Sequence, residues 1–317
     1  MKKILVTGAA GQIGSELIVA LRQRYGKNNV IACGHRTLPE RRILDSGPYE
    51  SFDVRDSALL FDVVKQYAID AIYHLAGVLS ATGEAKPNLA WDVNITSLRN
   101  VLEIARQHGC AVFFPSSIGA FGPSTPHDNT PQETIQRPQS MYGITKVTGE
   151  LLCDYYYRRY GVDSRGLRFP GLISYETLPG GGTTDYAVEI FYAALRGEKY
   201  TCFLRNGTRL DMMYMPDAIR AAIELMEADS GRLTFRNAFN VTAMSFGPED
   251  LCAEIQKIIP DFIMDYNVDP VRQAIADSWP NNMDDSAARE QWGWQPEYDL
   301  PAMARDMVEK LSLKLGS

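Results

Sequence analysis

The feature that most constrains the fold is a glycine-spaced turn near the N-terminus. Residues 7–14 read TGAAGQIG, so Gly8, Gly11 and Gly14 follow an apolar run and precede a segment of helical periodicity. The first glycine permits a tight turn, the second lets backbone N–H groups approach a pyrophosphate, and the third lets the helix pack closely on the strand. A pyrophosphate at this point meets a helix N-terminus, which favours anions. The spacing therefore predicts a dinucleotide-binding strand-turn-helix unit.

Apolar strand-like runs alternate with helical patterns over the first half of the chain. The expected strands are residues 3–7, 29–33, 71–76, 111–117 and 163–169. The expected helices are residues 13–26, with Ile13, Leu17, Leu21 and Tyr25 on one face, 58–68 and 89–109. This alternation predicts an α/β fold, a doubly wound parallel sheet of the Rossmann kind with helices on both faces.

The regular alternation of strand-like and helical segments ends after Phe169. A loop rich in glycine and proline precedes a helical run there, and later segments alternate less regularly. We expect a smaller C-terminal substrate lobe there. The apolar segment 210–228 predicts a strand and a helix that return to the first lobe, so the two lobes interleave. The expected dinucleotide-binding domain is residues 1–169 plus about 211–242, and the expected substrate lobe is about 170–210 plus 243–317.

The second strand ends without the acidic side chain that such chains usually place there. Gly34, His35 and Arg36 stand in its place. An acid at this point accepts hydrogen bonds from the adenosine ribose hydroxyls and repels a 2'-phosphate. Its absence relaxes the bias against NADP, so the residues at this point leave both NAD and NADP open. A short basic cluster, Arg36, Arg41 and Arg42, is either a solvated loop or a phosphate contact.

Three residues between positions 117 and 146 form a candidate group for proton transfer. Tyr142 and Lys146 are four residues apart on an expected helix, hence on one face, and Ser117 ends the fifth expected strand. A phenol with a pKa near 10 is a poor base at neutral pH, but an adjacent ammonium favours the phenolate. Lys146 can also hold a ribose hydroxyl, and Ser117 can hydrogen-bond the substrate oxygen. Taken alone, the Tyr/Lys spacing also suits an ordinary amphipathic helix.

The ordered set TGAAGQIG, Ser117 and YGITK resembles the extended short-chain dehydrogenase/reductase superfamily, which includes sugar-nucleotide epimerases, dehydratases and reductases. Five further segments are similar to the short-chain type of L-threonine 3-dehydrogenase, and this likeness runs essentially end to end. They are HLAGVLSATGE, LRFPGLIS, LPGGGTTDYAV, MMYMPDAI and SWPNNMDDSAAREQWGW. One departure is Asp211, where threonine dehydrogenases more often carry proline and sugar-nucleotide relatives carry an acid preceded by an arginine that is Leu210 here.

The resemblance implies oxidation of the C3 hydroxyl of L-threonine to L-2-amino-3-oxobutanoate, with hydride transfer to C4 of a nicotinamide and Tyr142 as the base. It also implies NAD as the first expected cofactor. The expected catalytic residues are Tyr142, Lys146 and Ser117. The expected cofactor contacts are Gly8, Gly11, Gln12, Ile13, Gly14, Gly34, His35, Arg36, Asp53, Val54, Leu75, Ala76, Gly77, Tyr142, Lys146 and Pro170. The expected substrate contacts are Ser80, Ser117, Tyr142, Gly182, Thr184 and Asp185.

The segment LPGGGTTDYAV places Gly180, Gly181 and Gly182 ahead of a helix. We expect Thr183 or Thr184 to cap this helix and Asp185 to lie in its first turn. Such a junction can cradle an amino-acid carboxylate through backbone N–H groups. The alternative is a flexible loop with an ordinary helix cap.

Charge and cysteine usage limit the partners. A net charge of -7 and a pI near 5.3 argue against nucleic acid or an anionic membrane as the main partner. The five cysteines form no CxxC pair and no histidine stands at metal-ligand spacing, so we expect reduced thiols, no metal site and a cytoplasmic protein without a leader or membrane span. By analogy with the superfamily, residues 89–109 and 142–161 pair between subunits of a homodimer. The alternative hypotheses of function are a sugar-nucleotide epimerase or dehydratase and a non-catalytic dinucleotide sensor.

Overall fold

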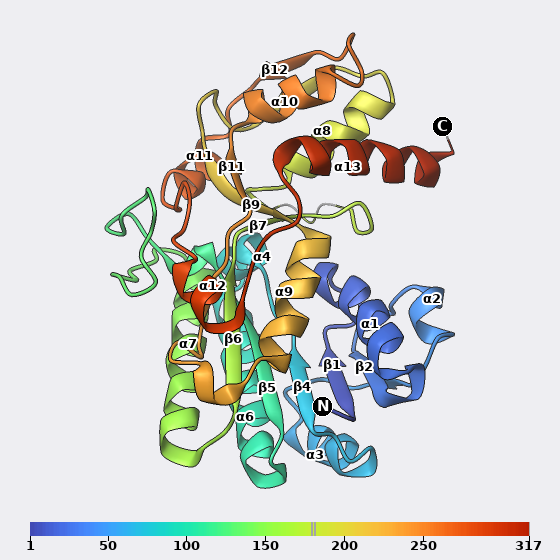
Figure 1. Ribbon diagram of the computed structural model, residues 1–317, viewed down its shortest axis with the longest axis vertical. Coiled ribbons are helices and arrows are strands. Elements are labelled where there is room, and N and C mark those ends of the chain that lie inside the picture. The colour runs from blue at the N-terminus through green and yellow to red at the C-terminus, as the bar shows by residue number, and fades with distance from the viewer. Residues whose placement is uncertain (179, 181, 317) are drawn as a thin grey trace.

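A seven-stranded sheet is the base of the larger lobe in the computed structural model, which describes residues 1–178, 180 and 182–316 (Figure 1). All its strand pairs are parallel. In spatial order the strands are β10 (Phe239–Asn240), β6 (Ser164–Phe169), β5 (Ala111–Ser117), β4 (Ala71–His74), β1 (Ile4–Thr7), β2 (Val30–Gly34) and β3 (Tyr49–Ser51). The order reverses at β1, which lies between β2 and β4, and ligands bind parallel sheets at the carboxyl ends beside such a point. The predicted doubly wound Rossmann sheet is confirmed.

Helices bury both faces of this sheet, and the side chains of each strand point alternately to one face and the other. Leu5 and Ile72 pack on one face and Val6 and Tyr73 on the other, and all four are fully buried. The first face is covered by α3 (Ser57–Gln66), α6 (Ser97–His108) and α7 (Met141–Tyr160). The second face is covered by α1 (Gln12–Tyr25), α9 (Met215–Glu227) and, near β10, α12 (Ser286–Trp292).

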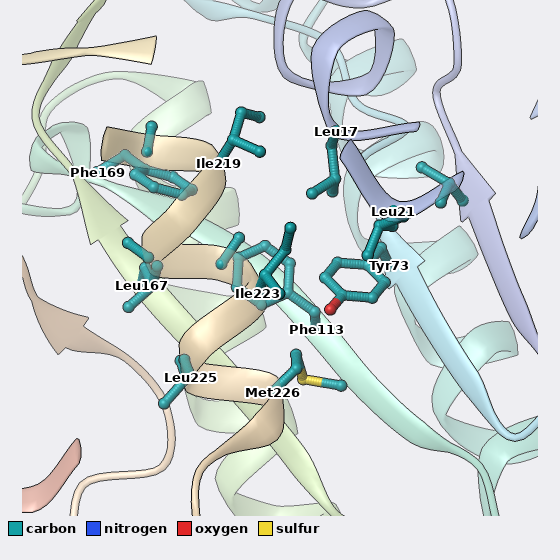
Figure 2. Packing of buried hydrophobic residues seen from close by; sticks show 14 of the residues in the cluster. Leu17, Leu21, Tyr73, Phe113, Leu167, Phe169, Ile219, Ile223, Leu225 and Met226 are labelled. Carbon is teal, nitrogen blue, oxygen red and sulfur yellow. The ribbon is translucent and has the colours of Figure 1, made fainter. Parts of the chain in front are cut away.

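Helix α9 shows how the second face is closed (Figure 2). Its Ile223 lies beside Phe113 of β5 and its Ile219 points towards Leu17 of α1, and all four residues belong to one buried cluster. Burying one such aliphatic side chain contributes about 1.5–3 kcal/mol. The helix near the middle of the second half is thereby fixed to the sheet formed by the first half, as the sequence predicted.

The smaller lobe has its own core between helices and two short sheets. Its strands are β11 (Met244–Phe246), β9 (Leu210–Tyr214) and β7 (Gly171–Ile173) in one sheet, and β12 (Met264–Tyr266) and β8 (Tyr200–Cys202) in the other. Its helices are α8 (Tyr186–Leu195), α10 (Pro248–Gln256), α11 (Pro270–Ala276) and α13 (Leu300–Leu315), which Figure 1 shows at the upper end of the molecule.

The expectation for segment 210–228 is half wrong. The helix packs on the large sheet, but strand β9 pairs with β7 and β11 in the three-stranded sheet. Its alternate side chains reach both cores, since Met213 joins the core of the larger lobe while Met212 and Tyr214 join that of the smaller one. The exact domain boundaries, which were argued from this segment, stay a prediction.

Three further details differ from the sequence-based expectations. The expected helix 89–109 is α5 (Pro87–Trp91), a π-helical turn (Asp92–Thr96) and α6 in succession. Strands β3 and β10 were not expected, because each is too short to show a periodicity. Helix α8 begins at Tyr186 with Asp185 as its N-cap, so neither Thr183 nor Thr184 caps it; Gly181 lies outside the described residues.

The remaining elements are short. They are α2 (Arg41–Leu44), α4 (Ser80–Ala85) and the 3-10 turns Lys27–Asn29, Ile118–Ala120 and Ser230–Arg232. All five cysteines are buried and form no disulfide. Within residues 1–178, 180 and 182–316, no helix has the length and apolar content needed to cross a membrane.

Candidate active site

A cavity of about 490 Å³ opens where the carboxyl ends of β4, β5 and β6 face the smaller lobe. Twelve of the predicted site residues line it: Gln12, Ile13, Leu75, Gly77, Ser80, Ser117, Tyr142, Lys146, Pro170, Gly182, Thr184 and Asp185. Other lining residues that the sequence reasoning missed include Val78, Thr82, Ser116, Phe169 and Trp279. Trp279 comes from the loop after α11, about 160 residues from Ser117 in sequence, and no sequence signal linked the two.

The glycine turn has the geometry that the spacing predicts. Gly8 has φ +76°, and a Cβ there would lie 2.8 Å from the Ala76 nitrogen. A Cβ on Gly14 would lie 2.2 Å from the Gly8 carbonyl oxygen, so α1 lies closer to the backbone that follows β1 than any side chain allows. Gly11 is the N-cap of α1, and no side chain caps the N–H groups of the first turn. The turn therefore leaves helix N–H groups for an anion.

His74, the last residue of β4, contacts Thr7 just before this turn. The sequence did not predict a role for this histidine. It is buried, its Nδ1 lies 3.0 Å from Thr7 Oγ1, and its Nε2 lies 2.9 Å from Ser97 Oγ. Because Ser97 donates its own proton to the Val93 carbonyl and Thr7 Oγ1 accepts from the Ala76 N–H, the imidazole carries its proton on Nε2. Burial lowers the pKa of His74 to about 3. A neutral imidazole thus ties β1 to β4 and α6.

Asn94 holds the segment that follows β4. Its Oδ1 accepts from the Val78 N–H at 2.7 Å, and its Nδ2 donates to the Val78 carbonyl at 3.1 Å and to Thr145 Oγ1 at 3.0 Å. Asn94 lies in the π-helical turn between α5 and α6, a distortion that often occurs at functional sites. Sequence reasoning missed it, because an asparagine inside a helical pattern carries no signal of its own.

Tyr142, Lys146 and Ser117 meet in the cavity as predicted. The Lys146 Nζ lies 5.2 Å from the centre of the Tyr142 ring and donates to the Pro115 carbonyl at 2.6 Å. Ser117 Oγ accepts from the Gly119 N–H at 3.1 Å, and a Cβ on Gly119 would lie 3.1 Å from the Tyr142 ring. A side chain at position 119 would push the phenol a few tenths of an ångström away from the end of β5.

The pKa shifts at this group differ from the expectation. Burial raises the pKa of Tyr142 to about 12, and a hydrogen bond with Ser117 acts in the opposite direction. Burial lowers the pKa of Lys146 to about 8, and the negative charge of Glu150 opposes that shift. The expected lowering of the Tyr142 pKa is absent, because the ammonium is directed to the Pro115 carbonyl and desolvation dominates.

A buried ion pair lies one helical turn beyond Lys146. Glu150 contacts Arg168 of β6 at 2.9 Å, accepts from Gln136 at 2.9 Å and accepts a short hydrogen bond from the Ser116 hydroxyl. Arg168 also donates to the Gln132 carbonyl at 2.8 Å. Since these polar groups satisfy one another, the network fixes α7 against β5 and β6 and with them the position of Lys146.

The end of β2 lies outside the main cavity. Gly34 stands against Tyr49 of β3, and a Cβ at position 34 would lie 2.7 Å from the Tyr49 hydroxyl oxygen. That hydroxyl is buried and has no hydrogen-bond partner among the described residues. The sequence showed the missing acid at Gly34 but not that a tyrosine fills its space. Nearby, His35 Nδ1 lies 3.6 Å from Asp53, and Arg55 pairs with Asp53 at 2.5 Å and, by hydrogen bonding, holds the pKa of that carboxyl at about 2.

The substrate-side residues come from both lobes. Ser80 begins α4 beyond β4, and Thr184 packs against β7, where a Cβ on Gly171 would lie 2.6 Å from its methyl carbon. Asp185 accepts from the Gly182 N–H at 2.6 Å, so the carboxylate shapes the turn that precedes α8. The predicted residues Gly8, Gly11, Gly14, Gly34, His35, Arg36, Asp53, Val54 and Ala76 do not line the main cavity. Among the described residues no cluster of histidine, cysteine, aspartate or glutamate could hold a metal ion.

Comparison with known proteins gives consistent results. The family described as the NAD dependent epimerase/dehydratase family matches residues 4–241. An uncharacterized epimerase/dehydratase of Staphylococcus saprophyticus is 54% identical over 99% of this chain and 98% of its own length.

Solved structures add detail. The L-threonine dehydrogenase of Clostridium difficile is 56% identical with a TM-score of 0.97, covering 99% of this chain and 98% of the other. A metagenomic L-threonine 3-dehydrogenase described as monomeric is 45% identical with a TM-score of 0.94, covering 99% of this chain and all of the other. The resemblance seen in the sequence is confirmed.

Proposed function

The chain belongs to the NAD dependent epimerase/dehydratase family, and we propose that it oxidises the C3 hydroxyl of L-threonine to L-2-amino-3-oxobutanoate with a nicotinamide dinucleotide. The observation that carries this proposal is the meeting of Tyr142, Lys146 and Ser117 in one cavity with Ser80 and Thr184. The names of the solved relatives support the choice of substrate.

A dinucleotide fits the residues present. The glycine turn leaves no room for a side chain at Gly8 or Gly14, and the N-terminus of α1 presents N–H groups that favour a pyrophosphate. When bound, the nicotinamide supplies the acceptor for the C3 hydride. The family description favours NAD. NADP stays open, because Gly34 neither holds the ribose hydroxyls nor repels a 2'-phosphate.

The chain's own residues handle the proton. Tyr142, as a phenolate, takes the proton of the C3 hydroxyl and becomes a neutral phenol, and the Ser117 hydroxyl donates a hydrogen bond to the substrate oxygen. Lys146 is mostly charged at neutral pH, because its pKa is about 8, and its ammonium stabilises the phenolate. A second contribution is orientation, since a fixed geometry can remove several kcal/mol of the barrier (about 7–11 kcal/mol at most).

The substrate side suits a small amino acid. The cavity wall carries the hydroxyls of Ser80 and Thr184, which can hold a carboxylate and an ammonium through hydrogen bonds, beside Gly182, whose N–H is donated to Asp185. Asp185 is the acidic side chain of this wall and faces the same space. The chain has Leu210 where sugar-nucleotide relatives carry an arginine, so a sugar nucleotide would lack that contact.

One assay tests the proposal. The purified chain is mixed with L-threonine and either NAD or NADP, and the absorbance of the reduced nicotinamide is followed, with L-serine and a UDP-sugar as parallel substrates. We expect reduction to depend on L-threonine and to be weak with L-serine, which lacks the C4 methyl group. Turnover of the UDP-sugar without net reduction of added cofactor would instead establish an epimerase or dehydratase. Binding of NAD without turnover of any substrate would indicate a sensor.

A further inference from the structure

A turn at the junction of the two lobes joins the cofactor side to the substrate side. Residues 174–177, which we call the junction turn, follow strand β7 and lead to Gly182, Thr184 and Asp185 in the cavity wall. Two consecutive residues of helix α1, Ser15 and Glu16, contact this turn immediately after Gly14 of the glycine turn. These contacts therefore connect the glycine turn to the segment that leads to the substrate side of the cavity.

Ser174 is the centre of the junction turn. Its side chain is fully buried, and its hydroxyl donates to Glu16 Oε1 at 2.5 Å. The same hydroxyl oxygen accepts from the Glu176 N–H at 3.0 Å and more weakly from the Thr177 N–H at 3.5 Å. Since the serine proton is committed to the carboxylate, the oxygen is oriented to accept from both backbone groups. Glu16 thereby determines the conformation of the turn through Ser174.

A second contact lies beside the first. Ser15 donates its hydroxyl proton to the Gln12 carbonyl at 3.1 Å, so the Thr177 hydroxyl is the donor in the 3.3 Å contact between Thr177 and Ser15. Gln12 is the first residue of α1 and lines the cavity. The junction turn is thus bonded to the turn of helix that a pyrophosphate would meet.

Two cations hold the outer side of the junction turn. Arg42 of α2 lies 3.1 Å from the Glu176 carboxylate, and Lys314 of α13 donates to the Tyr175 and Glu176 carbonyls at 3.1 and 2.6 Å. Arg42 belongs to the basic cluster for which the sequence left two readings. It is paired with Glu176 and Glu40, so its charge serves an ion pair within the chain, which neither interpretation had foreseen.

We propose that Glu16 is a positioning residue that, through Ser174 and the junction turn, sets where the loop bearing Gly182 and Thr184 lies relative to the glycine turn. The role of that loop in substrate binding rests on the proposed function. Glu16 touches neither substrate nor cofactor in this scheme. It keeps the loop that bears Gly182 and Thr184 at a fixed position relative to the glycine turn.

The charge of Glu16 responds to pH in the neutral range. Burial raises the pKa of Glu16 to about 7, with the Ser174 hydrogen bond acting in the opposite direction. The charged or titratable groups around it are Glu176, which raises its pKa, Arg42 and Lys314, which lower it, and the phenols of Tyr175 and Tyr214. As pH falls through 7 the carboxylate is neutralised, and a charge-assisted hydrogen bond becomes a neutral one of roughly half the strength.

Hydrogen exchange of the whole chain tests the proposal without relying on any substrate. Amides of residues 174–178 are compared in the wild type, Ser174→Ala and Glu16→Gln, with Glu309→Gln, an exposed glutamate on α13, as the matched control. We expect exchange about tenfold faster in Ser174→Ala and Glu16→Gln, unchanged exchange in Glu309→Gln, and unchanged protection of β4 in all three. Wild-type exchange rates in both junction variants would overturn the proposal.

Kinetics and pH separate positioning from general loss of structure. With L-threonine we expect both junction variants to raise KM about tenfold while kcat and the Kd for NAD stay within twofold. After correction for intrinsic exchange, protection of residues 174–178 in the wild type should decrease from pH 8 to pH 6, and this dependence should be absent in Glu16→Gln. The same pH dependence in Glu16→Gln would contradict the role of the carboxylate. Absence of L-threonine turnover in the wild type would reject the proposed function and leave the exchange result standing.

Discussion

At the scale of single residues, Tyr142 carries the proposed chemistry. Its phenol lies in the cavity between Ser117 and Lys146, and burial holds its pKa at about 12. A phenol with so high a pKa is protonated at neutral pH, so Tyr142 must lose its own proton to solvent before it can accept that of the C3 hydroxyl. Lys146, the charged side chain beside the ring, is placed to stabilise the phenolate that acts as the base.

Tyr142→Phe should nearly abolish oxidation of L-threonine, because it removes the proton acceptor and keeps the ring. General base catalysis contributes roughly 10²–10⁴-fold, and we expect kcat to fall within that range. The Kd for NAD, measured by quenching of intrinsic fluorescence, should change less than threefold. Near-normal turnover would remove Tyr142 from the base role. Tyr155→Phe, on the exposed surface of the same helix, is the matched control.

Gly34 and Tyr49 determine the second prediction at this scale. Gly34→Asp alone places a Cβ 2.7 Å from the Tyr49 hydroxyl oxygen, so we expect a lower thermal midpoint and little gain in cofactor preference. Gly34→Asp combined with Tyr49→Ala frees that space. The double variant should raise the ratio of kcat/KM for NAD to that for NADP about tenfold, the effect of one charge-assisted hydrogen bond. An unchanged ratio in the double variant would show that position 34 does not contact the ribose.

At the scale of elements, the site depends on how strands β1 and β4 are held together. The imidazole of His74 joins Thr7 at the end of β1 to Ser97 on α6, and the hydrogen bond that Nδ1 accepts from the Thr7 hydroxyl requires the neutral ring. Burial lowers the pKa of His74 to about 3, so the folded chain disfavours protonation that the unfolded chain accepts below about 6.5. Stability from this group is fully present above about 6.5 and is lost as pH falls towards 3.

The predicted consequence is an acid-sensitive stability that belongs to one residue. Below pH 6.5 the free energy of unfolding of the wild type should gain a slope of up to about 1.4 kcal/mol per pH unit from His74. His74→Gln should lose that part of the slope, while His108→Gln, an exposed histidine, should keep it. Urea titrations at pH 5 and pH 7 measure the difference. Equal slopes in the wild type and His74→Gln would contradict the assignment.

At the scale of the whole molecule, helices α6 and α7 form an outer layer of the larger lobe (Figure 1). Helix α7 exposes large apolar side chains, Leu151 and Tyr155, with exposed fractions of 63% and 52%. The homodimer expected through these helices stays a prediction, and a related structure is described as monomeric. The exposed side chains are compatible with either state, because surface apolar residues are common on monomers.

The dimer prediction has a direct test. The wild-type mass by analytical ultracentrifugation should be twice that of the 35.4 kDa chain. Leu151→Arg should shift the chain to monomer at micromolar concentration, because a buried unpaired charge opposes association. Leu313→Arg, at a more exposed leucine on α13, should leave the mass unchanged. A wild-type monomer would reject the expected pairing of α6 and α7.

The amino-acid sequence alone is enough to predict the alternating strands and helices of the larger lobe and its local motifs. The apolar period of each strand and helix, the glycine spacing before α1 and the four-residue step from Tyr142 to Lys146 are local patterns, and short-range sterics decide them. It also placed Ser117 at the end of a strand. Parallel strands end at one edge, so these residues were expected to meet.

The three-dimensional fold was needed to show which distant segments complete the site. Trp279 in the cavity wall, Tyr49 against Gly34, Glu150 paired with Arg168 and Ser174 bonded to Glu16 are contacts between segments far apart in sequence or on different elements. The same is true of strand β9, whose side chains suit either core and whose sheet is selected by its neighbours β7 and β11. Hydrogen bonds and packing of this kind depend on the position of each partner in space, which no local period encodes.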